Sequence, residues 1–330
     1  MNKGKLKILA GTAAALIAFL IVMQMSNRDS APDNERLFPG LKAQVNDIAT
    51  VTITRAGDES PTVVSRASGT WVIASRDDYP IDIGKLREFL LQIADAKTVE
   101  RKTSNPDLYD QLGVQDPAID GSKGARVQVS GEGVAYDFIV GNVAQPGYRY
   151  VRKFDESQSW LIDKDPRLPR SAAEWLVKDI IDVKSTDVRS VTITHPDGEE
   201  IRISKESADT ANFDVADIPD GRELSYSTVA NSIAGALSAL TLDDVRKAGE
   251  AGAESVSATF ESFDGRRFVV LVTKDDDENW ISVTASPDED ATADAAAIND
   301  RLAGWQFRIA DYKANQLTRR WDDILKAEAE

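Results

Sequence analysis

Hydrophobic and polar residues alternate in two short segments of this 330-residue chain that lie 140 positions apart. The first segment, Val51–Thr54, reads VTIT, and so does the second, Val191–Thr194; each has an aspartate four residues before its valine. Alternation with a period of two is typical of a strand that buries one face. The recurrence of the pattern predicts that one structural plan is used twice along the chain.

The elements expected after these strands follow the same order in both copies. A turn comes first, with Gly57 in one copy and Pro196–Gly198 in the other. Further strands are expected at 62–66, 70–73, 125–129 and 136–140 in the first copy and at 200–204, 212–215, 256–260 and 267–272 in the second. Between them, hydrophobic residues at helical spacing predict one helix per copy, with Leu86, Leu90 and Ile93 or with Val229, Ile233, Leu237 and Leu240.

This pattern predicts an α+β fold class, in which two repeated αβ modules with mainly antiparallel sheets follow an N-terminal transmembrane helix. The expected divisions are residues 1–25 for cytoplasmic lysines and the anchor, 26–44 for a polar linker, 45–184 for module 1 and 185–330 for module 2. A repeat of this size indicates a duplicated domain rather than the unit of a solenoid.

The start of the chain has the composition of a membrane anchor. Ile8–Met25 contains no charged residue, and a helix of this length spans about 27 Å, close to the thickness of the hydrocarbon layer. Lys3, Lys5 and Lys7 precede the segment, and positive residues stay on the cytoplasmic side. We therefore expect a single-pass protein of the bacterial inner membrane with a cytoplasmic N-terminus and a periplasmic body. A cleaved signal peptide and a buried soluble helix are the alternatives.

Small residues within this segment lead to a second expectation. Gly11, Ala15 and Ala18 lie close to one face of a helix, and small residues let helices approach closely in a membrane. We expect this face to contact a partner helix. The alternative is that these residues only adjust the hydrophobicity of the segment.

Composition narrows the classes of partner and site. The formal net charge of −16 argues against a nucleic-acid partner, because phosphate binding requires a basic face. The chain has no cysteine, which excludes disulfides, thiolate metal sites, a cysteine nucleophile and a lipidated cysteine. Its content of hydrophobic residues, 42%, is sufficient for a packed core without disulfides.

Patterns typical of catalysis or metal binding are missing from the sequence. His195 is the single histidine, and its place in an expected turn predicts an exposed side chain without a catalytic partner. The acidic run Asp275–Asn279 lacks the spacing of a calcium loop and is expected at the tip of a hairpin. Trp175 and Trp321 occupy matching positions in the two copies, which favours a role in packing. We expect no enzyme activity, no cofactor and no metal site.

Four segments share the pattern of a known protein family. They are Leu108–Pro117, Phe138–Asn142, Tyr150–Arg152 and Trp305–Ala314. In this order they resemble the family of unknown function numbered 4340 (DUF4340), and the resemblance extends over nearly the whole chain. The signature in the first segment consists of Tyr109, Leu112, Gly113 and Pro117. Gly113 can end a helix in a left-handed conformation and Pro117 prevents its continuation, so the signature is expected to have a structural role.

The resemblance implies a bacterial inner-membrane protein encoded beside ABC transporters of the gliding-motility type. The function expected from it is that of a non-enzymatic accessory or scaffold subunit of an envelope ABC-type transport complex. The expected partners are the lipid bilayer and a transporter permease or an associated envelope protein. Two alternatives stay open: an anchored periplasmic module that binds a glycan or another ligand, and a carboxylate-dependent hydrolase.

Overall fold

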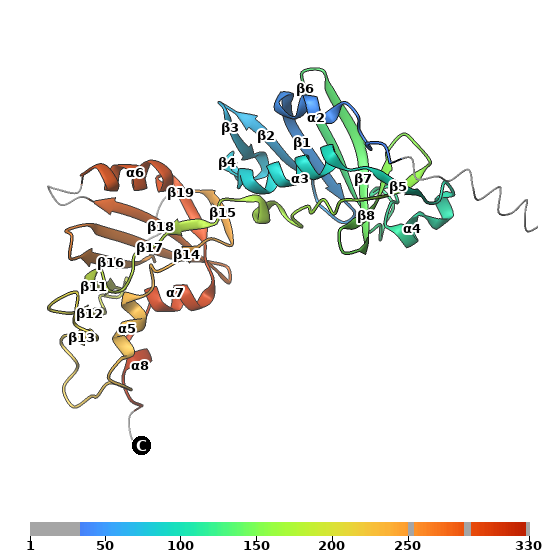
Figure 1. Ribbon diagram of the computed structural model, residues 1–330. Coiled ribbons are helices and arrows are strands. Elements are labelled where there is room, and N and C mark those ends of the chain that lie inside the picture. Colours follow the sequence, from blue (N-terminus) through green and yellow to red (C-terminus); the bar gives the residue numbers. More distant parts are fainter. Residues whose placement is uncertain (1–33, 250–253, 287–291, 328–330) are drawn as a thin grey trace, which may run out of the picture. The chain divides into compact units, whose positions relative to one another are not determined.

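Two compact units make up the part of the chain that the computed structural model describes, which is residues 34–249, 254–286 and 292–327 (Figure 1). Unit 1 consists of residues 34–74 and 83–170. Unit 2 consists of residues 75–82 together with the described residues from 171 onward. The short segment 75–82 thus belongs to unit 2, although residues of unit 1 flank it on both sides in the sequence.

The fold class differs from the expectation. Strands account for 39% of the structure and helices for 21%, so the protein is mostly antiparallel β-sheet and the predicted α+β class is wrong. One reason is that the helices are short. The helix expected from Val229 to Leu240 ends at Ala234, and Leu240 begins a strand instead. Ala239 has a φ of 45°, a left-handed conformation that a right-handed helix does not contain.

The expected transmembrane helix lies outside the described residues. This applies to the whole of Ile8–Met25, including Gly11, Ala15 and Ala18. Within the described parts of the chain, no helix is both long enough and apolar enough to cross a membrane.

The sheet of unit 1 is antiparallel, with the strand order β3-β2-β1-β6-β7-β8-β9-β5. The elements of unit 1 are α2 (Leu41–Gln44), η1 (Val45–Asp47), β1 (Ile48–Arg55), β2 (Thr62–Ala67), β3 (Thr70–Ile73), α3 (Ile83–Asp95), β5 (Thr98–Arg101), η3 (Pro106–Leu108), α4 (Tyr109–Leu112), β6 (Ala125–Gly131), β7 (Val134–Gln145), β8 (Tyr148–Lys153) and β9 (Ser159–Ile162). Figure 1 shows α3 alongside the strands of this sheet. Leu86, Leu90 and Ile93 of α3 are buried because their spacing of three and four residues places them on one face.

Unit 2 has an antiparallel sheet with the order β13-β12-β11-β16-β17-β18-β19-β15, and β10 pairs separately with β14. The short helix η2 (Ala74–Arg76) leads into this unit. The other elements are β4 (Tyr79–Pro80), η4 (Ala172–Trp175), β10 (Asp179–Ile181), β11 (Val188–Thr194), β12 (Glu200–Ser204), β13 (Asp214–Val215), α5 (Val229–Ala234), β14 (Leu240–Thr241), β15 (Asp244–Lys247), β16 (Val256–Ser262), β17 (Arg267–Asp275), β18 (Glu278–Ser286), α6 (Thr292–Leu302), β19 (Trp305–Arg308), α7 (Asp311–Leu317) and α8 (Trp321–Ile324).

The two sheets share one connectivity. In each, the first strand lies between the second strand and a later strand, β6 or β16; three strands then follow in chain order, and an earlier strand, β5 or β15, lies at the far edge. Even an irregularity recurs: the pairing of the first strand with the later hairpin shifts register between Ile48 and Thr50 in unit 1 and between Val188 and Ser190 in unit 2. Because these positions are 140 residues apart in both cases, the shared plan extends to the details of strand register.

The cores form where the alternating strands direct their hydrophobic side chains. Val51 and Ile53 of β1 have no exposed surface, and Val191 and Ile193 of β11 are equally buried. Burial of one face of a strand fixes its register, because a slip of one residue would expose every buried side chain. The VTIT segments therefore set the position of an interior strand in each sheet.

Candidate functional site

A cleft of about 720 Å³ lies at one end of the sheet of unit 1. Neighbouring strands supply its walls: Arg55 ends β1 and pairs with Ala125 at the start of β6, and Ala125 pairs with Val140 of β7. Arg149 of β8 pairs with Val143 of β7, because β8 lies next to β7 on the side opposite β6. The remaining wall is the loop after β9, including Asp165 to Arg170. Strand pairing thus brings together residues that are far apart in the sequence.

Positive charge is concentrated in this hollow, which we call the basic cleft. Five basic side chains line it and one acidic side chain, Asp165, accompanies them; the basic residues are Arg55, Lys123, Arg149, Arg167 and Arg170. Two other hollows in the described structure have the opposite character. A hollow of about 430 Å³ in unit 1 is lined by three acids and one base, and one of about 350 Å³ in unit 2 by four acids and one base. The basic cleft is therefore unusual for a chain of net charge −16.

Two arginines of the basic cleft are held by well-defined contacts. The Arg149 Nε atom donates to Asp165 Oδ1 at 2.7 Å, and its Nη1 atom donates to the Gly141 carbonyl at 3.0 Å. The side chains of this ion pair are only 18% and 15% exposed. Arg55 Nη2 donates to the Pro169 carbonyl at 2.6 Å, which ties the loop after β9 to the end of β1. The Arg167 side chain is 81% exposed, and its Nε atom lies 3.5 Å from Asp165 Oδ2, so Asp165 pairs with two arginines.

A crowded backbone corner supports the wall of the basic cleft. Gly113 ends α4 with φ 67°, a left-handed conformation, and a Cβ atom there would lie 2.6 Å from Asn142 Oδ1. A Cβ atom on Gly124 would lie 2.4 Å from the Gly113 carbonyl, and one on Gly141 would lie 2.5 Å from the Leu112 carbonyl. Three chain segments therefore pack with no room for side chains. Asn142 lines the basic cleft directly after this corner, so the corner sets the position of the cleft wall.

The side chains of the signature lie behind this corner. Tyr109 is buried, its hydroxyl donates to the Ser157 carbonyl at 2.5 Å, and it packs with Val114 and Ile139. The guanidinium of Arg152 lies 4.7 Å from the centre of the Tyr109 ring. Leu112 packs on the same cluster, and Pro117 is buried. None of the four signature residues lines the basic cleft.

Comparison with known proteins identifies the family. Residues 71–259 match the family described as Domain of unknown function (DUF4340), and this is more than half of the chain. The chain belongs to the DUF4340 family. Neither a curated protein nor a solved structure matches it. The matched segment of this DUF4340 protein includes the signature and every basic residue of the cleft except Arg55.

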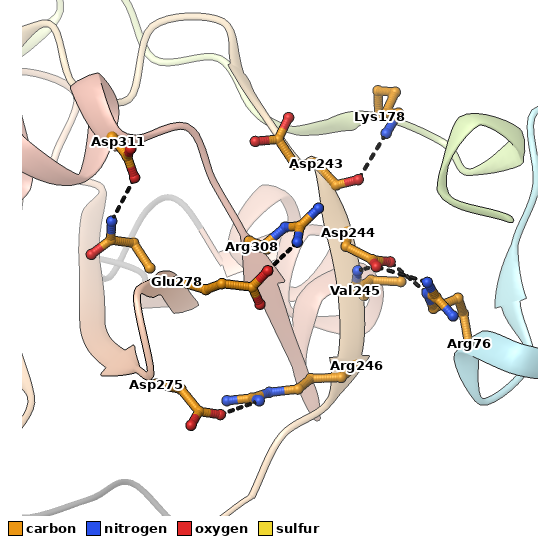
Figure 2. Close-up of polar contacts among 11 residues, drawn as sticks. Arg76, Lys178, Asp243, Asp244, Val245, Arg246, Asp275, Glu278, Arg308 and Asp311 are labelled. Carbon is orange, nitrogen blue, oxygen red and sulfur yellow. Dashed lines mark hydrogen bonds and ion pairs between the residues drawn. The ribbon is translucent and has the colours of Figure 1, made fainter. Parts of the chain in front are cut away.

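A second charged region of the DUF4340 protein lies around β15 and the turn between β17 and β18 in unit 2, as Figure 2 shows. Its side chains are paired: Arg76 forms two hydrogen bonds with Asp244, at 2.5 and 2.8 Å, and Arg308 pairs with Glu278. The hydrogen bond with Asp244 raises the pKa of Arg76 above its usual value. Within the described residues, no group of histidine and acidic side chains is arranged to hold a metal ion. We assign the ion pairs of this region a structural role, because they connect separate elements of unit 2.

His195 of the DUF4340 protein is buried, so the prediction that it is exposed is wrong. Only 4% of the residue is accessible, and its Nε2 atom lies 3.0 Å from the Arg319 carbonyl. The cause is a segment distant in sequence: Arg320 pairs with Asp197 at 2.8 Å, and the Trp321 backbone N–H donates to Glu199 at 2.7 Å. These contacts fold the end of the chain over the β11–β12 turn.

The basic cleft could not be predicted from the sequence. Its basic residues come from two strands and two loops spread over more than 100 positions, so no window of the sequence contains them together. One local signal was present. Arg167 and Arg170 flank Leu168 and Pro169 in an otherwise acidic chain, and two basic residues next to prolines predict an exposed basic loop.

Proposed function

We propose that this DUF4340 protein is a non-enzymatic accessory subunit of a bacterial envelope ABC-type transport complex, with its body outside the cytoplasm. It acts by binding: unit 1 holds a ligand in the basic cleft, while the body contacts other subunits of the complex. The family resemblance supports the transport context, and the geometry of unit 1 supports the binding role.

The basic cleft carries the proposal. Ligand sites in proteins are concave and enclose about 300–1,000 Å³, a range that includes its volume of about 720 Å³. Five basic side chains around one hollow give it a positive potential, which attracts negatively charged ligands. The arrangement is therefore best explained as a site for a negatively charged ligand.

The residues that line the basic cleft favour a negatively charged ligand over the ligands of the two alternative functions, glycan binding and hydrolysis. Sugar-binding platforms use aromatic rings, whereas the described lining of the basic cleft contains none. A glycoside hydrolase needs two carboxyl groups beside the scissile bond. The lining offers the carboxylate of Asp165, which is already bound to Arg149.

Affinity purification tests the transport context. The tagged full-length chain is purified from its native membrane in mild detergent, and the co-purifying proteins are quantified by mass spectrometry. We expect the permease and ATPase subunits of one ABC transporter to be enriched over a control with the same tag on an unrelated membrane protein. Enrichment of no transporter subunit would contradict the transport context.

A reporter fusion tests the placement of the body. Alkaline phosphatase fused after Glu330 should be active, because this enzyme folds only outside the cytoplasm. A cytoplasmic reporter fused at the same position should be inactive. The opposite pair of results would place the body in the cytoplasm and exclude the proposed arrangement.

A further inference from the structure

We infer that the basic cleft recognises a phosphoryl group, as part of a soluble phosphorylated compound or of a phospholipid headgroup. This inference rests on the proposed binding role of unit 1 and specifies the chemistry of the ligand. Three observations carry it: the balance of charge, the fixed geometry of the arginines, and a comparison with the second copy of the same sheet.

The excess of basic side chains favours an anionic ligand. Five basic side chains and one carboxylate give the lining a formal charge of +4, since 5 − 1 = 4. Part of this charge is compensated, because Arg149 and Arg167 share Asp165 and Lys123 pairs with Asp110 outside the lining. A phosphoryl group carries up to two negative charges and three acceptor oxygens, and it matches the planar donors of arginine.

The arginines of the basic cleft are arranged before any ligand binds. Arg149 is held by Asp165 and the Gly141 carbonyl, so its guanidinium loses little further freedom on binding. Arg167 and Arg170 lie on a loop that contains Pro166 and Pro169, whose fixed φ angles restrict the backbone. Arg55 also holds this loop by donating a hydrogen bond to the Pro169 carbonyl, so the backbone that carries the two exposed arginines is restrained.

The second copy of the sheet forms without basic residues at two of these positions. Along the matched strands, His195 of unit 2 takes the place of Arg55, and Asn279 takes the place of Arg149. The hollow lined by Asn279 has the opposite charge, with Asp243, Asp277, Glu278 and Asp311 against Arg308. Both copies form the same sheet, so this strand arrangement does not depend on a basic residue at either position; in unit 1, Arg55 and Arg149 also hold the loop after β9.

Isothermal titration calorimetry on the purified full-length chain tests the inference. The probes at low ionic strength are inorganic pyrophosphate, glycerol 3-phosphate, short-chain phosphatidylglycerol and succinate. We expect saturable binding of pyrophosphate with one site per chain and at least about tenfold weaker binding by the double variant R167Q/R170Q. The matched control is R87Q, which removes an exposed arginine of α3 in the same unit, outside the basic cleft, and should bind like the wild type.

The results distinguish a phospholipid headgroup from a soluble phosphorylated compound, and some outcomes would contradict the inference. Tighter binding of phosphatidylglycerol than of glycerol 3-phosphate assigns the site to a lipid headgroup, and the reverse order assigns it to a soluble compound. Unchanged binding by R167Q/R170Q, no saturable binding of any of the three phosphate-containing probes, or equally tight binding of succinate would overturn the inference. Arg167 and Arg170 are exposed, so circular dichroism should show a folded variant. A failed co-purification with a transporter would leave this calorimetric result unaffected.

Discussion

Replacing Gly113 with alanine tests whether the backbone corner behind the basic cleft is as crowded as its geometry indicates. The substitution adds one methyl group at a residue with φ 67°. The new Cβ atom would lie 2.6 Å from Oδ1 and 2.8 Å from Cγ of Asn142, and 3.1 Å from its backbone nitrogen. Two costs therefore combine: the left-handed conformation and the close contacts.

A matched glycine separates the two costs. Gly133 has the same φ of 67°, but a Cβ atom there meets nothing within 4 Å. G133A should destabilise unit 1 by about 1–2 kcal/mol, the cost of the left-handed conformation for alanine. G113A should cost about 1–3 kcal/mol more, because adding a methyl group to a packed site forces its neighbours to move. Its total destabilisation is then about 2–5 kcal/mol.

Hydrogen exchange at increasing urea concentration measures these differences, because mass spectrometry follows peptides of unit 1 separately from those of unit 2. The double variant G113A/N142A should recover part of the loss, since it removes the side chain that the new methyl group contacts most closely. Recovery should be incomplete because the Asn142 backbone stays in place. Equal destabilisation by G113A and G133A would refute the argument that the corner is crowded.

Three further substitutions test individual contacts. Tyr109→Phe removes the hydrogen bond to Ser157 and should lower the stability of unit 1 by about 1 kcal/mol in the same exchange measurement. Glu199→Ala removes the acceptor of Arg320 and of the Trp321 backbone N–H, so the NMR signal of the single histidine should move toward its position in an unfolded chain; an unchanged signal would contradict the role of Glu199. Burial lowers the pKa of Lys313, so the unfolded state binds more protons between that lowered pKa and the ordinary value of 10.5, and stability should rise with pH across this window. Lys313→Met should abolish that rise in urea unfolding at several pH values, and an identical slope in both proteins would show that another group titrates.

The strands could be predicted from the sequence because their signal is local. Alternation within four residues is sufficient to locate β1 and β11, and both VTIT segments lie in central strands. The helix expected from Val229 to Leu240 was wrong in its length, because hydrophobic spacing did not reveal the left-handed Ala239. Local periodicity thus identified where elements begin more reliably than where they end.

Features that depend on distant segments could not be predicted. His195 is buried by Arg319–Trp321, more than 120 residues away, so its turn sequence alone suggested exposure. The basic cleft depends on strand pairing in the same way. The matching of Trp175 with Trp321 was also misleading. In the first copy, the backbone of Trp175–Val177 pairs with that of Pro80–Asp82. In the second copy, Ile324–Lys326 takes the place of Trp175–Val177, so Trp321 is not the equivalent of Trp175.

That pairing explains why the compact units do not coincide with the repeated sequence. The segment 75–82 lies within the first copy of the repeat but packs in unit 2. Arg76 forms its ion pair with Asp244 there, and the Tyr79 ring, 3% exposed, meets Trp305 edge-to-face at a centroid distance of 4.9 Å.

A fragment beginning at Ser171 would therefore lose part of its own core. The loss of a buried aromatic side chain such as Tyr79 typically costs about 3–5 kcal/mol, which is a large fraction of the 5–15 kcal/mol that stabilises a typical domain. Such a fragment should melt at a lower temperature than unit 2 does within the whole chain, and a peptide of residues 75–82 added in excess should raise its melting temperature. A fragment as stable as unit 2 in the intact protein would show that the segment packs there without contributing to its stability. The repeat thus accounts for the shared strand order of the two copies, while the packing of residues 75–82 in unit 2 determines which parts of the chain fold together.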